Sequence, residues 1–210
     1  MTRVLIVDDE RNIQKAFRSD IMSASDRYEL VDCIVNAADA LLVCGAKNID
    51  LVLMDINTAN NESGLVAAEN IKKRYPGIKI IMTTSYTDPE ALKEAQRIGV
   101  ESFWFKDYSN IELVEVMDRT VNADGYMPEE APDVKLGETT IHRLTDTEKE
   151  VLHNLVECVS IKRIAEKMFI EETTVKTHLK SIYNKVGCNN KTELLLLAMQ
   201  SKLVLPPKRQ

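Results

Sequence analysis

The strongest constraint on the fold is an alternation, five times over, of short apolar runs and amphipathic segments within residues 1–122. The apolar runs are rich in β-branched and aromatic residues, as strands are, and lie at 4–7, 28–35, 50–54, 78–82 and 102–105. The amphipathic segments space their apolar residues by three and four, as helices do, and lie at 13–22, 37–46, 65–75, 90–98 and 111–121. This order predicts an α/β domain with a five-stranded parallel, doubly wound sheet covered by helices on both faces.

The end of the chain follows another pattern, which predicts a small all-α domain of four helices. The helical segments lie at 146–156, 161–168, 173–186 and 191–201, and no convincing strand accompanies them. Thr145 and Glu148 have the spacing of a capping box before the first of these helices, and Gly187 ends the third. The short connection at 169–172, between the second and third helices, predicts a helix-turn-helix.

Charge divides the chain in the same place. The 27 Lys and Arg against 33 Asp and Glu give a net charge of −6, which, if evenly spread, would oppose a polyanionic partner. The charge is uneven: the net value is −7 over 1–124, −2 over 125–143 and +3 over 144–210. The middle stretch has two prolines, two glycines and no apolar period, as linkers do. The predicted divisions are therefore a first domain at 1–122, a linker at 123–142 and a second domain at 143–210.

Two classes of protein are disfavoured by the sequence. No apolar stretch approaches the roughly 18–20 residues that span a bilayer, and the acids at 8–10 come too early for a signal peptide. The four cysteines lie far apart, with no Cys-x-x-Cys pair and no histidine at metal-ligand spacing, which disfavours a disulfide framework or a zinc site. We expect a cytoplasmic protein with reduced thiols and no membrane partner.

Side chains suited to phosphoryl chemistry follow four of the predicted strands. The acids at 8–10 follow the first strand, Asp55 ends the third, Thr84 ends the fourth and Lys106 follows the fifth. Parallel strands end at one edge of a sheet, so these carboxylates would repel one another unless they share a cation. Mg²⁺ prefers such oxygen ligands, and a carboxylate beside it can attack a phosphoryl group. A hydroxyl and an ammonium group could then bind the phosphoryl oxygens.

This set of residues resembles the receiver domain of two-component response regulators, whose fold is flavodoxin-like, and the resemblance covers residues 1–122. It implies that Asp55 is the phospho-acceptor and that Asp9 and Asp55 supply carboxylates to Mg²⁺. Asp8 would support the metal through water, and the backbone carbonyl of Asn57 would complete its protein ligands.

The resemblance also assigns switch residues and shows one departure from the family pattern. It implies that Thr84 is the switch hydroxyl, Lys106 the phosphate-binding lysine and Phe103 the aromatic switch, although a strand aromatic such as Phe103 could equally be plain core. After the acceptor the family usually has Met-Pro and then a glycine eight residues on. Here 56–64 has no proline and is one residue longer. The geometry of this loop, and the rate of dephosphorylation, are therefore open.

The third helix of the second domain has a basic face. Lys176 and Lys180 lie four residues apart and share a helical face with Thr173 and Thr177. Residues 172–191 contain four lysines and one acidic residue. Such a face can reach base edges and phosphates when its helix lies in the major groove, although a lysine-bearing helix is more often only a solvated surface.

The surrounding motifs resemble the LuxR/NarL/FixJ family over residues 143–201. They are Leu144-Thr145-x-x-Glu148-x-x-Val151-Leu152, Ile164-Ala165 and Thr174-Val175-Lys176-x-His178. The resemblance implies contacts to bases and phosphates from Lys176, Thr177 and Lys180, and to the DNA backbone from Thr174, Lys185 and Lys191. Glu171 stands where the family usually has Ser or Thr, and Lys191 where Arg is common. The leucines at 194–197 cannot all face inward, and the family resemblance implies a dimer seam there.

Together these features predict a transcription factor rather than an enzyme. In the leading hypothesis a sensor histidine kinase phosphorylates Asp55, and the chain then binds promoter sites in double-stranded DNA as a homodimer. RNA polymerase is a further candidate partner. One alternative is a phospho-independent DNA-binding regulator whose receiver acts only in dimerisation. The other is an aspartyl-phosphate phosphatase, disfavoured because Asn57 stands where such enzymes carry a second acid.

Overall fold

The five predicted strands form one parallel sheet in the computed structural model, which describes residues 1–203. The strands are β1 (Thr2–Val7), β2 (Tyr28–Ile34), β3 (Leu51–Asp55), β6 (Lys79–Thr84) and β7 (Ser102–Phe105). Their spatial order is β2-β1-β3-β6-β7, and every pairing is parallel. The doubly wound α/β prediction is therefore confirmed. The chain reverses its direction of winding between β1 and β3, which is where such sheets hold their ligands.

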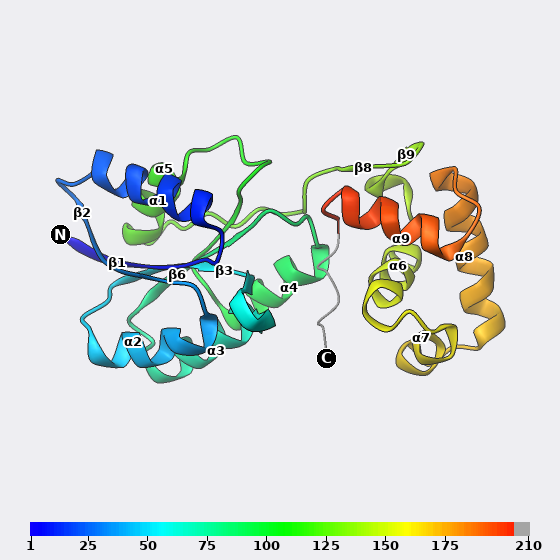
Figure 1. Cartoon of the computed structure of the whole chain (residues 1–210), viewed down its shortest axis with the longest axis horizontal. Coiled ribbons are helices and arrows are strands. Elements are labelled where there is room, and N and C mark those ends of the chain that lie inside the picture. Colours follow the sequence, from blue (N-terminus) through cyan, green and yellow to red (C-terminus); the bar gives the residue numbers. More distant parts are fainter. Residues whose placement is uncertain (204–210) are drawn as a thin grey trace. The chain divides into compact units, whose positions relative to one another are not determined.

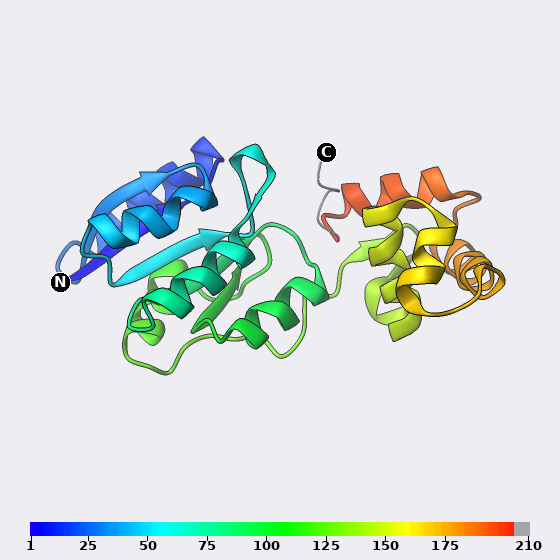
Figure 2. The ribbon, with the colours of Figure 1, turned by 90° about the horizontal axis from the view of Figure 1, so that it is seen from below.

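Helices cover both faces of the sheet, as Figures 1 and 2 show. They are α1 (Arg11–Ser23), α2 (Ala40–Ala46), α3 (Gly64–Arg74), α4 (Pro89–Ile98) and α5 (Leu113–Val121). Helices α1 and α5 pack together on one face, while α3 packs against both α2 and α4 on the other. The predicted helix at 37–46 begins as a short 3₁₀ turn, η1 (Ala37–Asp39), because the Asn36 side chain accepts a hydrogen bond from Ala38 N.

Burial explains why the central strands read as unbroken apolar runs. Every residue of β3 is buried, since helices cover both of its faces. On the α1–α5 side, Phe17 and Ile21 of α1 pack with Val116 and Met117 of α5 over β1 and β3. This core holds the carboxyl ends of β1 and β3 side by side.

Among the described residues, the first compact unit comprises residues 1–85 and 89–131, and the second comprises residues 132–203 together with the short segment 86–88. The second unit begins with a hairpin of β8 (Lys135–Leu136) and β9 (Thr139–Thr140) and a 3₁₀ turn, η3 (Ile141–Arg143). Its helices are α6 (Asp146–Cys158), α7 (Ile161–Met168), α8 (Glu172–Val186) and α9 (Lys191–Gln200). The four-helix prediction is confirmed. Residues 204–210 of the predicted second domain lie outside the described residues.

The hairpin lies within the stretch predicted as a linker, 123–142, and was not expected as a strand pair. Leu136 on β8 is fully buried and belongs to the core of the second unit, with Ile141 beside it. Gly137 has φ +59, which a two-residue turn between paired strands requires. The domain boundaries predicted from composition remain a prediction.

The second unit is held at its centre by a buried carboxylate. Thr145 and Glu148 form the predicted capping box at the start of α6. The Glu148 carboxylate also accepts hydrogen bonds from Ser181 Oγ and Lys185 Nζ of α8, both at 2.6 Å. Burial alone would raise the pKa of Glu148, but these bonds and those from Thr145 outweigh it and lower the pKa to about 2.

We expect this carboxylate to make the second unit sensitive to acid. Because the pKa of Glu148 is lowered on folding, its stabilisation is present above the unfolded value of about 4.3 and is lost as pH falls toward 2. The loss between pH 7 and pH 3 is on the order of 2 kcal/mol. Glu148→Gln should destabilise the unit at pH 7 and flatten this dependence. Urea titrations of the full chain, followed through the methyl resonances of Val175 and Leu179, measure both effects.

The matched control is Glu150→Gln on the same helix, where the side chain is exposed. It removes one carboxylate without touching the Glu148 network, so the wild-type pH dependence should remain. Equal acid sensitivity in the wild type and in Glu148→Gln would contradict the prediction.

Candidate functional site

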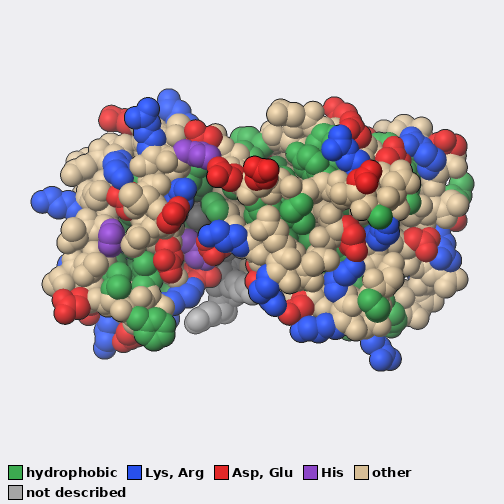
Figure 3. All heavy atoms as spheres, turned by 180° about the vertical axis from the view of Figure 1, so that it is seen from behind, with side chains coloured by type: hydrophobic (Ala, Val, Ile, Leu, Met, Phe, Trp, Pro, Cys, Tyr) green, Lys and Arg blue, Asp and Glu red, His purple; other side chains and the backbone are tan. Residues whose placement is uncertain are grey.

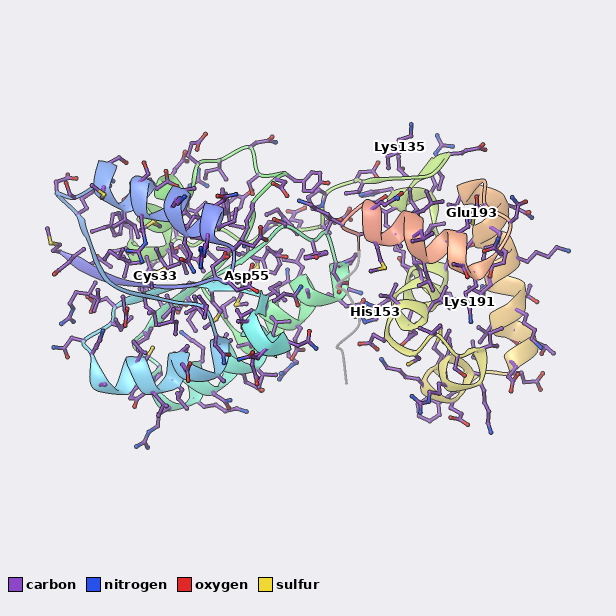
Figure 4. All side chains as sticks on the ribbon, viewed as in Figure 1. Cys33, Asp55, Lys135, His153, Lys191 and Glu193 are labelled. Atoms are coloured by element: carbon purple, nitrogen blue, oxygen red, sulfur yellow. The ribbon has the colours of Figure 1, made fainter. Side chains whose placement is uncertain are left out.

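Two carboxylates and one ammonium group meet at the carboxyl ends of the strands, in the first unit. Lys106 Nζ lies 2.6 Å from Asp8 Oδ2 and 2.6 Å from Asp55 Oδ1. All three side chains are almost completely buried, with 3%, 0% and 10% of their surfaces exposed. Figure 4 labels Asp55 where β3 ends. The predicted convergence of Asp8, Asp55 and Lys106 is present.

Backbone donors fix the remaining carboxylate oxygens. Asn57 N donates to Asp55 Oδ2 and Glu10 N donates to Asp8 Oδ1, each at 2.9 Å. Gln14 Nε2 also donates to the backbone carbonyl of Asp8 at 2.6 Å. Because each carboxylate is held at both oxygens, the two acids are oriented before any ligand arrives.

The electrostatics of this pocket are unbalanced. Burial, and then the nearby charge of Asp8, raise the pKa of Asp55 to about 7, although Lys106 opposes the change. Burial would lower the pKa of Lys106, but Asp55 and Asp8 outweigh it, so the pKa is raised and Lys106 stays charged. One ammonium group therefore stabilises two buried acids incompletely, and a further cation would be bound favourably.

The loop after Asp55, which departs from the family pattern, folds into a tight hairpin. Strands β4 (Asn57–Thr58) and β5 (Glu62–Ser63) pair antiparallel around the 3₁₀ turn η2 (Ala59–Asn61). Asn60 and Asn61 have φ values of 59° and 62°, which asparagine tolerates better than most residues. Glu62 N donates to the Ala59 carbonyl and closes the turn. The extra residue is thus absorbed away from the pocket.

The glycine that ends this loop is required by close packing. Gly64 N donates to the Ile56 carbonyl at 2.8 Å, and a Cβ on Gly64 would lie 1.9 Å from the carbonyl oxygen of Asp55. Ser63 then caps α3 by accepting from Val66 N. Any side chain at position 64 would displace the strand end that carries Asp55.

Of the other predicted residues, Asp9, Asn57 and Thr84 lie at or just after the carboxyl ends of strands, whereas Phe103 lies within β7. Thr84 is buried at the end of β6, and its carbonyl accepts a hydrogen bond from Lys106 N at 2.8 Å. Asp9 is exposed beside Asp8. Asn57 Nδ2 is buried without a hydrogen-bond partner among the described residues. Phe103 is fully buried and packs against Phe105 with ring centroids 4.9 Å apart, as a core aromatic does, so its switch role stays a prediction.

The oxygen ligands of the pocket are of the kind that Mg²⁺ prefers, although the Lys106 ammonium lies between the carboxylates of Asp8 and Asp55. Within residues 1–203, no three His, Cys, Asp or Glu side chains are grouped closely enough to hold a metal ion. Asp8 and Asp55 nonetheless present hard oxygen donors, and one ammonium group, that of Lys106, faces both buried carboxylates.

The second candidate surface is α8, whose predicted basic face is exposed. Lys176, Thr177 and Lys180 are exposed, whereas Val175, Leu179 and Ile182 face the core. Phe169, with φ +55, ends α7 and begins the short turn to α8, as in a helix-turn-helix, and Gly187, with φ +76, ends α8. Over the face drawn in Figure 3, acidic and basic side chains are interspersed on both units, so charge alone does not mark a binding surface there.

The remaining predicted DNA contacts are engaged within the domain. Lys185 forms an ion pair with Glu148. Lys191 Nζ donates to the backbone carbonyl of Val159, the residue after α6, at 2.8 Å. Thr174 is half-buried in the first turn of α8. Glu171 precedes α8, and its carboxylate accepts from Thr173 Oγ1 at 3.1 Å. Lys185 thus ties α8, and Lys191 ties α9, to α6, and the DNA contacts of Thr174, Lys185 and Lys191 stay predictions.

Sequence reasoning missed two features of these surfaces. The sequence does not predict the bond between Lys185 and Glu148, because the two residues are 37 positions apart and no local pattern indicates that they meet. The hairpin before α6 has one signal that could have identified it, a glycine between Leu136 and the β-branched pair Thr139-Thr140.

Comparison with known families accounts for both units. Residues 4–118 match the response regulator receiver domain, and residues 142–198 match the bacterial regulatory proteins of the luxR family. The transcriptional regulatory protein YdfI of Bacillus subtilis is 30% identical over 97% of this chain and 98% of its own length. The DNA-binding transcriptional activator DevR/DosR of Mycobacterium tuberculosis is 24% identical over 99% of this chain and 98% of its own.

Solved structures share the fold. RcsB of Salmonella enterica serovar Typhimurium, bound to the promoter rprA in the presence of the phosphomimetic BeF₃⁻, has a TM-score of 0.60 at 20% identity, covering 94% of this chain and 98% of RcsB. A structure of two RcsB dimers bound to two parallel DNAs has a TM-score of 0.62 at 19% identity, with the same coverage. Among residues 1–203, no helix has the length and apolar character needed to cross a membrane.

The close approach of Gly64 to Asp55 predicts a measurable cost for a single methyl group. Gly64→Ala should lower the free energy of unfolding of the first unit by about 1–3 kcal/mol, because the added Cβ meets the backbone and not a movable side chain. Urea unfolding followed by fluorescence of Trp104, the only tryptophan in the sequence, reports on this unit. Gly77→Ala is the matched control, because a Cβ there meets nothing within 4 Å, and it should be neutral or slightly stabilising. Equal stability of the two variants would contradict the packing described for Gly64.

Proposed function

The chain belongs to the two-component response regulators that join a receiver domain to a LuxR-type helix-turn-helix, and from this membership we propose that Asp55 accepts a phosphoryl group that controls DNA binding by α8. The chain is thus a DNA-binding transcription regulator, of a family whose members are generally not enzymes. The observation that carries the proposal is the buried group of Asp8, Asp55 and Lys106, in which both acids are oriented and incompletely neutralised.

Asp55 has the position and the environment of a phospho-acceptor. One carboxylate oxygen attacks phosphorus, the bond from phosphorus to the donor's leaving atom breaks, and the electron pair of that bond leaves with the donor. Asn57 N holds Asp55 Oδ2, so Oδ1, now on Lys106, is the oxygen that changes partner. The raised pKa of Asp55 means that the nucleophilic carboxylate form becomes more abundant as pH rises through about 7.

Three groups near the acceptor are suited to bind the phosphoryl oxygens. The Lys106 ammonium can transfer from Asp55 Oδ1 to a phosphoryl oxygen while keeping its bond to Asp8. Thr84 lies at the end of the adjacent strand and carries a hydroxyl. Asn57 Nδ2 is a buried donor without a partner in the described part of the chain, which supports an incoming ligand oxygen as its partner.

Mg²⁺ would be held by Asp9, Asp55 and the Asn57 carbonyl, with Asp8 bound through water. When bound, the metal ion neutralises charge that develops on the transferred group. Asp8 is fully buried and fixed by Glu10 N, so its part is to keep the local charge negative enough to attract a cation.

In the second unit, we assign base and phosphate contacts to Lys176, Thr177 and Lys180, because these side chains are exposed on one face of α8. Thr174, Lys185 and Lys191 are proposed as contacts to the DNA backbone. Self-association is supported by α9, where Leu196 and Met199 are 55% and 45% exposed. A sensor histidine kinase, promoter DNA and a second copy of the chain are the proposed partners, with RNA polymerase as a further candidate.

Two other functions have less support. A phosphatase needs a second acid beside the nucleophile, and Asn57 occupies that position. The best support for a phospho-independent regulator is the atypical loop after Asp55, yet this loop closes as a hairpin and leaves Asp55 in place. Steady hydrolysis of small phosphate esters would favour the phosphatase, and the experiment below distinguishes the phospho-independent regulator.

The full chain should gain one phosphoryl group when incubated with acetyl phosphate and Mg²⁺, because the acceptor carboxylate is already oriented. Intact mass spectrometry measures the gain, which chelation of Mg²⁺ and Asp55→Asn should each abolish. Asp26→Asn, at an exposed carboxylate outside the pocket, is the matched control and should be phosphorylated normally. Phosphorylation should also tighten binding to genomic DNA fragments selected by the protein. Binding that is tight and identical in the wild type and Asp55→Asn would establish the phospho-independent alternative instead.

A further inference from the structure

We propose that a pocket between the β8–β9 hairpin and the end of α8 binds a backbone phosphate of the DNA that α8 reads, an inference that rests on the proposed DNA-binding function. This hairpin pocket has a volume of about 830 Å³ and is lined by Lys135, Glu138, Thr139, Thr140, Arg143 and Lys185. None of these residues except Lys185 was expected to contact DNA.

The hairpin is fixed to α8 by its backbone. Glu138 N donates to the Val186 carbonyl at 2.9 Å, and a Cβ on Gly137 would lie 2.2 Å from that same oxygen. Leu136 anchors the hairpin in the core. The pocket therefore keeps its position relative to the recognition helix whatever the rest of the chain does.

The lining has the chemistry of a phosphate site. Lys135, Arg143 and Lys185 bring three cations against the single carboxylate of Glu138, and two threonine hydroxyls add neutral donors. The Lys185 ammonium already forms an ion pair with Glu148. Lys135 and Arg143 are exposed and make no side-chain ion pair within residues 1–203. Figure 4 labels Lys135 at the β8–β9 hairpin.

The pocket lies where the backbone of a bound duplex is expected. Around the axis of α8, Lys185 lies about 80° from Thr177 and about 140° from Lys180, so it lies at the side of the exposed face and not on it. A helix in the major groove, which is about 12 Å wide, directs one face to base edges and its flanks to the phosphates beside the groove. Lys180 faces the bases in this arrangement, and the hairpin pocket extends the flank on which Lys185 lies.

The test is the salt dependence of DNA binding by the full chain carrying Lys135→Ala and Arg143→Ala together. The probes are a duplex selected from random sequence by the wild-type protein and a scrambled duplex of the same length. Two lost phosphate contacts should lower the slope of log affinity against log salt by roughly 0.9 each and weaken both duplexes about equally, by roughly 10-fold in total. The selected sequence itself should not change, because the pocket contacts no base.

Two control variants separate this inference from the function on which it rests. Lys176→Ala with Lys180→Ala should abolish the preference for the selected duplex, and Lys73→Ala on α3 removes a cation from the first unit and should leave the slope unchanged. Wild-type affinity and slope in the Lys135/Arg143 variant, with preference lost in the Lys176/Lys180 variant, would overturn the hairpin pocket alone. Absence of DNA binding by the phosphorylated wild type would overturn both.

Ethylation of individual DNA phosphates locates the contact directly. Ethylation at one flanking phosphate should interfere with binding by the wild type and should cease to interfere with the double variant. The same side chains could instead bind a free phosphate ion. A titration of the full chain with inorganic phosphate, followed by NMR, tests this alternative. Saturable phosphate binding that requires Arg143, with no change in DNA affinity, would assign the pocket to a small phosphate and contradict the proposal.

Discussion

The first unit depends on one ammonium group, that of Lys106, which is bonded to two buried carboxylates. Lys106 Nζ lies 2.6 Å from both Asp8 and Asp55, and removing two such carboxylates from water is costly unless a cation compensates. The raised pKa of Asp55 shows that one lysine compensates only in part. Ionising Asp55 therefore costs stability as pH rises from about 4, its pKa in the unfolded chain, to about 7, and binding of a metal ion at the strand ends would reduce that cost. The same shortage of positive charge makes the site favourable for a bound cation.

The loop after Asp55 shows how this pocket tolerates a change in sequence. The family's proline is missing and one residue is added, yet the paired strands β4 and β5 contain the insertion in a turn at Asn60 and Asn61. Gly64 remains where the chain passes against the Asp55 carbonyl, because no side chain fits there. Backbone contact at the acceptor, rather than the composition of the loop, is what the site requires.

Much of this structure was predictable from the sequence, for a physical reason. Strands such as β3, buried on both faces, must be apolar throughout, and acids such as Asp8 and Asp55 stand out where those runs end. What could not be predicted depends on contacts between distant positions. The bond of Lys185 to Glu148 and the burial of Leu136 arise only when α6, α8 and the hairpin pack together. In the same way, no local pattern showed that Lys106 would bridge both acids.

The most direct test of this account is the titration of the Asp55 carboxyl carbon by ¹³C NMR in the full chain, assigned by its loss in Asp55→Asn. Without metal, the midpoint should lie near 7, because burial and Asp8 disfavour the ionised form. Added Mg²⁺ should move the midpoint to lower pH. A midpoint near 4 without metal, the ordinary value for an aspartate, would contradict the claim that one lysine leaves this pocket short of positive charge.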